Sequence, residues 1–152
     1  DPGGANYAMF QGAYSTVRLL VLVVMAGIYA VMSLSMRGMD IQMNNVVPFL
    51  IGGMFLVLGN LMGKLRPNWF IGIRTPWTLS SKQSWSRTHR AGGWVFIGGG
   101  LVMMASGLVS KPWAFTASLA LLIASSLGLA IYSYIVWKND PDKTPPAGTS
   151  PA

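Results

Sequence analysis

Four long apolar runs occupy most of this chain, and they limit it to few kinds of fold. The runs are Thr16–Met36, Val46–Met62, Gly92–Ser110 and Trp113–Trp137, and the only charged residue within them is Arg18. Because an α-helix rises about 1.5 Å per residue, about 20 apolar residues cross a hydrocarbon core of about 30 Å. The sequence therefore predicts an all-α, polytopic membrane helix bundle with about four transmembrane helices.

The overall composition agrees with a membrane protein. Charged residues make up 10% of the 152 residues and the mean hydropathy is +0.47, whereas soluble domains carry about 25% charged residues. The shortest run alone could be a buried helix of a soluble protein, but four runs in one small chain argue against that alternative. The net charge of +7 favours anionic lipids over nucleic acid as partners, because the apolar runs place the chain in a membrane.

The segment of residues 63–91, between the second and third runs, differs from everything around it. It contains six Lys or Arg residues, the only histidine and three tryptophans, and it has no acidic residue. A basic loop with tryptophans between apolar runs is typical of the cytoplasmic membrane–water interface, where side chains meet lipid headgroups or protein partners. The candidate binding residues are Lys64, Arg66, Asn68, Arg74, Trp77, Trp85, Arg87, His89 and Arg90.

The distribution of positive charge predicts the orientation of the chain. The central loop holds six Lys or Arg residues, whereas the first and third connections hold only Arg37 and Lys111. Cytoplasmic loops carry the excess of Lys and Arg, so the central loop is expected in the cytoplasm. With four spans, both termini are then expected on the cytoplasmic side as well.

Within the central loop, the pair Thr75-Pro76 is a helix-start signature, with threonine as N-cap and proline at the first helical position. It predicts an amphipathic interfacial helix from Pro76 to about Arg90. A helical wheel places on one face Trp77, Ser81, Trp85 and Thr88, with His89 at its edge. The opposite face would then carry Gln83, Arg87 and Arg90.

Small residues recur at regular intervals in the third and fourth runs. In the third run, small residues repeat every seven positions along two neighbouring lines. One line is Gly92, Gly99 and Ser106, and the other is Gly93, Gly100 and Gly107. In the fourth run, a four-residue spacing relates Ala120, Ala124 and Gly128. In lipid, such lines let another backbone approach closely, so we expect helix packing there. The alternative is the glycine content that is ordinary for membrane helices.

The residues needed for common catalytic and metal sites are not found together in the sequence. His89 has no second histidine and no acidic residue near it, and the four acidic residues lie outside the loop and the runs. Metal coordination, paired-carboxylate catalysis and a Ser-His-Asp arrangement therefore lack parts. We expect a protein that is not an enzyme and has no cofactor or metal. An enzyme acting on lipid phosphate is the remaining enzymatic alternative.

The two ends of the chain are expected to lie outside the membrane domain of residues 16–137. Residues 1–15 are Gly-rich and are expected to be irregular. Residues 138–152, KNDPDKTPPAGTSPA, are polar and Pro-rich, and they have too little apolar surface to bury. We therefore expect this tail to be a solvated extension.

The central loop resembles the hallmark of the SdpI family of membrane proteins. The matching elements are Gly59-Asn60, Gly63-Lys64, Arg66-Pro67-Asn68, the run GIRTPWTLS from Gly72 to Ser80, Trp85, Thr88-His89-Arg90 and Gly93. The resemblance covers roughly residues 46–137. It implies a multi-pass protein of the bacterial inner membrane that protects the producing cell from a membrane-active peptide toxin. The founding member of the family also captures a small cytoplasmic regulator at the membrane, so the resemblance implies such a partner as well.

A second interpretation belongs to a different class of protein. The small-residue faces of the third and fourth runs could pack against a larger membrane protein complex, with this chain as an accessory structural subunit. Identifying the proteins that purify with the chain from its native membrane would separate this interpretation from an immunity protein.

Overall fold

The computed structural model describes residues 7–67 and 71–145, with side chains from Gln11 onward. Its helices are α1 (Tyr7–Met36), α2 (Met43–Met62), α3 (Pro76–Leu79), α4 (Lys82–Val109) and α5 (Pro112–Lys138). The regular structure within the described ranges is entirely helical. All helices except α3 are long and apolar enough to cross a membrane. The predicted all-α membrane fold with four spanning helices is therefore confirmed.

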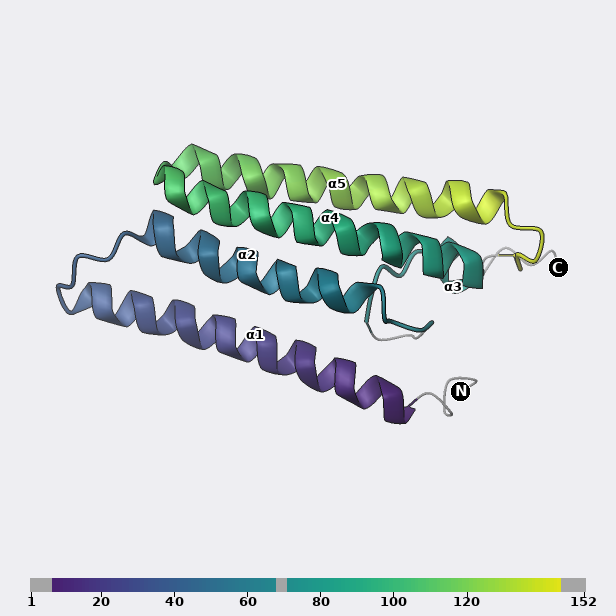
Figure 1. Cartoon of the computed structure of the whole chain (residues 1–152), viewed down its shortest axis with the longest axis horizontal. Coiled ribbons are helices and arrows are strands. Elements are labelled where there is room, and N and C mark those ends of the chain that lie inside the picture. The colour runs from purple at the N-terminus through teal and green to yellow at the C-terminus, as the bar shows by residue number, and fades with distance from the viewer. Residues whose placement is uncertain (1–6, 68–70, 146–152) are drawn as a thin grey trace.

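The four long helices lie side by side in the order α1, α2, α4 and α5 (Figure 1). Helix α4 packs between α2 and α5, whereas α1 contacts only α2 among the helices of the described ranges. Val24 is the one buried residue among the described side chains of α1, so most of the apolar surface of this helix faces outward. The start of α1, the end of α5 and the α2–α4 connection all lie at the same end of the molecule (Figure 1). We call this the loop end.

Backbone-to-backbone contact joins α4 to α2. A Cβ atom placed on any of three glycines of α4 would lie 2.7 to 2.9 Å from a carbonyl oxygen of α2. The facing pairs are Gly93 with Gly59, Gly100 with Gly52, and Gly107 with Asn45. Both helices thus present small or polar groups at seven-residue intervals, and the intervals match in antiparallel register. Only glycine permits such an approach in the middle of this interface.

The neighbouring line of small residues on α4 meets α5 instead. A Cβ atom on Gly99 would lie 2.5 Å from Leu122 Cδ1, whereas one on Gly92 would lie 2.8 Å from Ile73 Cδ1 of the loop and 3.5 Å from Leu129 Cδ1. A leucine side chain of α5 therefore fills the space over Gly99, and the loop shares the space over Gly92 with α5. Because successive residues of a helix are about 100° apart, adjacent glycines serve different neighbours. This explains why α4 carries glycine in pairs.

The predicted packing face of α5 lies on the outside of the described structure, so its packing partner stays a prediction. Ala120, Ala124 and Gly128 are all exposed, and a Cβ atom on Gly128 would meet nothing within 4 Å. The buried residues of α5 are instead Ala114, Ser118, Leu122, Leu129, Ser133 and Val136. The buried side of α5 therefore combines small residues with the leucines that lie over the glycines of α4.

Helix boundaries also differ from the expected ones. Helix α1 begins at Tyr7, inside the segment expected to be irregular, and α2 begins three residues before the second apolar run. The predicted interfacial helix is broken after Leu79, and its second part continues into the third run as α4. The break is stabilised by a second N-cap, because the Ser81 side chain accepts a hydrogen bond from Ser84 N at 2.9 Å.

Candidate functional site

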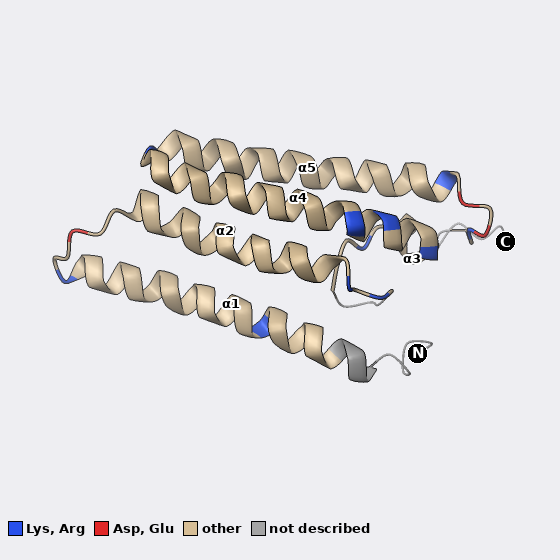
Figure 2. Ribbon diagram, viewed as in Figure 1, with Lys and Arg blue, Asp and Glu red and all other residues tan. Residues whose placement is uncertain are grey.

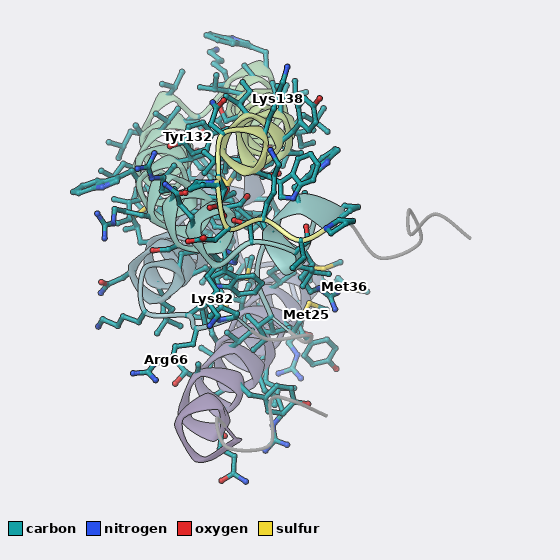
Figure 3. The ribbon with its side chains drawn as sticks, turned by 90° about the vertical axis from the view of Figure 1, so that its right-hand side faces the viewer. Met25, Met36, Arg66, Lys82, Tyr132 and Lys138 are labelled. Atoms are coloured by element: carbon teal, nitrogen blue, oxygen red, sulfur yellow. The ribbon has the colours of Figure 1, made fainter. Side chains whose placement is uncertain are left out.

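Positive charge is concentrated at the loop end of the molecule (Figure 2). The opposite end carries only Arg37 and Lys111 among the Lys and Arg residues of the described ranges. Arg66, Lys82 and Lys138 lie at this same end but are spread across it, on the α2–α4 connection, α4 and α5 respectively (Figure 3). The candidate site is therefore built by elements that are distant in sequence.

Gly72 and His89 form the centre of the loop structure. Gly72 has a φ of +119°, which glycine adopts without strain, and a Cβ atom there would lie 2.2 Å from His89 Nε2. The next residue, Ile73, donates its backbone N–H to His89 Nε2 at 3.0 Å. Any side chain at Gly72 would displace the ring from this amide. The glycine is thus required both for its conformation and for the space that the imidazole occupies.

Both nitrogens of His89 are bound to the backbone. Nε2 accepts from Ile73, so the ring proton of the neutral imidazole is assigned to Nδ1, which lies 2.9 Å from Trp85 O and donates to it. The imidazole also stacks on the Trp85 ring at 4.0 Å with an interplanar angle of 19°. Each side chain is only 1% exposed. Trp85 and His89, both expected to bind a partner or a lipid headgroup, are therefore internal to the loop.

Trp85 also ties α4 to the end of α2. Its indole Nε1–H donates to Leu65 O at 2.9 Å, three residues beyond the last residue of α2. The carbonyl would otherwise be left without a helical partner, since it follows the helix end. This bond, together with the bond from Ile73 to His89, anchors both halves of the loop to the first turns of α4.

A cluster of hydroxyl groups fastens α3 to α5. Thr75 and Thr78 form a capping box at the start of α3, and Thr78 Oγ1 also donates to Ile73 O at 2.8 Å. The Thr75 hydroxyl shares a hydrogen bond of 2.8 Å with the hydroxyl of Ser133 on α5. Trp77 packs edge-on against Tyr134 with ring centroids 5.2 Å apart. Trp77 is thus a partly buried packing residue of α3 rather than a free surface anchor.

The described part of the tail bends back to the loop, and it is exposed except at Asp140. Asp140 is 5% exposed and accepts a hydrogen bond from the Ser81 hydroxyl, the N-cap of α4. Thr144 donates from its backbone N to Ser80 O at 3.1 Å and from its hydroxyl to the same oxygen at 2.9 Å. The tail bonds to Ser80 and Ser81, where α3 and α4 separate. Asp140 is distant from the loop in sequence, and the fold places its carboxylate beside the loop.

The cations of the loop surround this buried network and remain at the surface. The exposed residues are Lys64, Arg66, Arg74, Lys82, Arg87 and Arg90. With its amide placed to satisfy both neighbours, Gln83 donates to Asp140 Oδ1 at 3.2 Å and accepts from an Arg87 Nη atom at 3.1 Å. Asn68, a further candidate, lies outside the described residues.

The geometry separates residues that build the loop from residues that can contact other molecules. The buried set consists of hydroxyl, imidazole and indole groups and the Asp140 carboxylate, and their hydrogen bonds run to the backbone or to other side chains. Among the described residues, no group of three His, Asp or Glu side chains comes together to hold a metal ion. The exposed set is cationic, and its ordinary chemistry is the binding of anionic groups such as phosphates and carboxylates.

Sequence reasoning missed several residues of the buried network. Thr78, Ser84, Ser133 and Asp140 are each at most 5% exposed, and each forms a hydrogen bond between elements or within the loop. Ser84, for example, donates to Ser133 O at 2.8 Å and so links α4 to α5. Serine and threonine are common in membrane helices and in loops, so their identity alone does not mark them as network residues.

A model of the SdpI/YfhL protein family matches residues 64–137. The match begins in the α2–α4 connection, includes α3 and α4, and ends one residue before the end of α5. Helices α1 and α2 and the tail that contains Asp140 lie outside it. No curated protein and no solved structure matches the chain.

Proposed function

Because the chain belongs to the SdpI/YfhL protein family through residues 64–137, we propose that it is a non-enzymatic immunity protein of the bacterial inner membrane. Its role is to protect the cell that makes it from a membrane-active peptide toxin. The loop end faces the cytoplasm in this proposal, in agreement with the excess of Lys and Arg there.

The observation that carries the proposal is that the residues of the family motif hold the loop in one conformation. The segment from Gly72 to His89 is locked by hydrogen bonds to α4, α5 and its own backbone, and the cations remain exposed around it. A rigid cationic platform suits recognition of another molecule. It does not suit catalysis by His89, because both ring nitrogens are already engaged with backbone groups.

The arrangement of the spans supports a toxin that acts within the bilayer. Among the helices of the described ranges, α1 contacts only α2, and its exposed apolar side chains include Leu22, Val23 and Tyr29. An apolar peptide helix that enters the membrane can pack on such an open face. The exposed cations of the loop end offer a separate surface on which a cytoplasmic regulator could be held.

Protection of living cells tests this proposal. A susceptible bacterium would express the chain, or an unrelated four-span protein at the same membrane level. Both strains would be challenged with synthetic membrane-permeabilising peptides, one apolar and one cationic and amphipathic. We expect slower membrane depolarisation and at least tenfold higher survival with this chain for one of the two peptides. Equal depolarisation in both strains with both peptides would contradict an immunity role.

One observation favours a second candidate, the accessory subunit of a larger membrane complex. Ala120, Ala124 and Gly128 form an exposed small-residue line on α5, and none of the described residues lies within 4 Å of a Cβ atom placed on Gly128. Such a line permits close approach by a helix of another protein. Purification from the native membrane in a mild detergent tests this candidate. A particle of much higher mass that dissociates with Gly128→Leu is the expected result for a subunit.

A further inference from the structure

We propose that the outward face of α4 between Arg87 and Gly98 binds an anionic phospholipid. This site goes beyond the immunity role, since it concerns the bilayer itself rather than a toxin. The ligand would place its phosphate against the two arginines of this face and its first acyl carbons along Trp94 and Gly98.

The four residues share one face of a continuous helix. They are three, four and four residues apart, which places Arg87, Arg90, Trp94 and Gly98 within an arc of about 80° at about 100° per residue. Both arginines are exposed, Trp94 is 72% exposed, and Gly98 is exposed as well. The lines of α4 that meet α2 and α5 lie on the other side of the helix. The face is therefore open to whatever surrounds the protein.

The chemistry of the face changes along the helix in the way that a phospholipid does. Two guanidinium groups one turn apart can hold a phosphate through paired N–H donors. Trp94 follows, and an indole is the side chain that prefers the level of the headgroups because one end is apolar and the other donates a hydrogen bond. A Cβ atom on Gly98 would meet nothing within 4 Å. This leaves a notch below the indole where an acyl chain can lie.

A neighbouring hydrogen-bond chain positions one of the arginines. The buried carboxylate of Asp140 holds the Gln83 amide, and that amide oxygen lies 3.1 Å from an Arg87 Nη atom. The guanidinium is therefore oriented before any ligand arrives, which lowers the entropic cost of binding. Helix α4 itself contains no Asp or Glu that would repel a phosphate on this face.

An acidic protein or a nucleic acid fits this face less well. After Trp94 along α4, the exposed residues are apolar, and they include Leu101 and Leu108 at 54% and 76% exposure. A ligand that covers the whole face must therefore be anionic at one end and apolar over the following turns. Among common cellular ligands, anionic phospholipids have this chemistry.

Lipid-dependent thermal stability in detergent provides the test. Purified chain would be heated with increasing phosphatidylglycerol, and separately with zwitterionic phosphatidylcholine. We expect phosphatidylglycerol to raise the melting temperature at lower concentrations than phosphatidylcholine. The double variant Arg87→Gln/Arg90→Gln should need at least tenfold more phosphatidylglycerol for the same shift. The matched control is Arg37→Gln/Lys111→Gln, which removes the same charge at the opposite end and should respond like the unmodified chain.

Two further variants keep the test decisive. Arg87→Lys/Arg90→Lys retains the charge but not the paired donors, so it should also bind phosphatidylglycerol more weakly. Trp94→Ala leaves the charge unchanged and should weaken binding, whereas Trp113→Ala, at a tryptophan 68% exposed at the other end, should not. The proposal is overturned if the arginine variants and their charge-matched control respond alike, which would reduce the effect to non-specific charge. Equal shifts with phosphatidylcholine would overturn it too.

Discussion

The two halves of α4 are held to their neighbours by different interactions. From Gly93 to Gly107 the helix meets α2 and α5 through glycines, with carbonyl oxygens or a leucine side chain 2.5 to 2.9 Å from where a Cβ would lie. From Ser84 to His89 it is held to the loop and to α5 by side-chain hydrogen bonds of 2.8 to 3.0 Å. Along its length, α4 thus changes from packing through side-chain hydrogen bonds in its first turns to close packing at glycines in the rest.

The surrounding solvent explains this difference. In hydrocarbon, apolar side chains gain little by meeting each other, so helices associate through close backbone contact and van der Waals packing. Outside the hydrocarbon, a loop has many backbone groups that need partners, and side chains such as His89, Trp85 and Thr78 supply them. The change falls near Gly92, where the predicted third span begins. The following predictions test each half separately, beginning with the largest expected effect.

In the glycine-packed half, Gly100→Leu should be the most damaging change. A Cβ atom at this position already lies 2.7 Å from Gly52 O, and a backbone atom cannot move aside as a side-chain tip can. We expect a loss of about 3 kcal/mol or more in stability. Thermal unfolding in detergent would measure it. The control is Gly98→Leu, two residues away with nothing within 4 Å; an equal loss there would show that the contact with α2 is not the cause.

In the hydrogen-bonded half, Gly72→Ala should have the next largest effect. The alanine would have to adopt a φ of +119° and displace His89 Nε2, so the bond to Ile73 N is lost. We expect a cost of about 2–3 kcal/mol. Amide hydrogen exchange should accelerate in the loop before it does in α2. Gly63→Ala is the matched control, because Gly63 has a φ of −67° and open space around it.

His89→Phe separates the hydrogen bonds of the ring from its stacking. Phenylalanine retains an aromatic ring beside Trp85 but leaves the Ile73 N–H without its acceptor. The expected cost is about 1–3 kcal/mol, measured by thermal unfolding and by exchange of the Ile73 amide. Unchanged exchange at Ile73 would mean that the imidazole contributes only its stacking.

The smallest expected effect concerns the tail. Asp140→Asn keeps the shape of the side chain but weakens its bond with the Ser81 hydroxyl, at a cost of about 1 kcal/mol. Protease cleavage between residues 138 and 145 should become faster. Asp142→Asn, at an exposed position two residues away, should not change the cleavage rate. If both variants are cleaved equally fast, the tail is not held by Asp140.

The sequence predicts the membrane half better than the loop end. Apolar run length locates the four spans, and the seven-residue repeat identifies the glycines of α4 that meet α2, because periodicity reports directly which residues share a helix face. For Ala120 and Ala124, which are exposed, the same logic leaves the partner open, since small size alone does not show which partner a face meets. Residues such as Gly52 and Gly59 needed the structure to be paired with their counterparts.

At the loop end, the Thr75-Pro76 start of α3 could be predicted because capping is local in sequence. The end of that helix after Leu79 could not, because a second N-cap at Ser81 competes with continuation and its carboxylate partner, Asp140, is 59 residues away. Long-range bonds of this kind leave no periodic pattern. The internal position of His89 was missed for the same reason, as its acceptor role depends on Ile73 in the preceding loop.

Cysteine cross-linking tests most directly the claim that adjacent glycine lines of α4 meet different helices. The chain has no cysteine of its own. The Cβ position of Gly99 lies 3.9 Å from Leu122 Cβ, and that of Gly93 lies 3.6 Å from Met62 Cβ, both within the range of about 3.5–4.5 Å that a disulfide spans. Oxidation should therefore close Gly99→Cys/Leu122→Cys and Gly93→Cys/Met62→Cys. The exchanged pairs, Gly99→Cys/Met62→Cys and Gly93→Cys/Leu122→Cys, should stay open; equal cross-linking of the exchanged pairs would contradict the account.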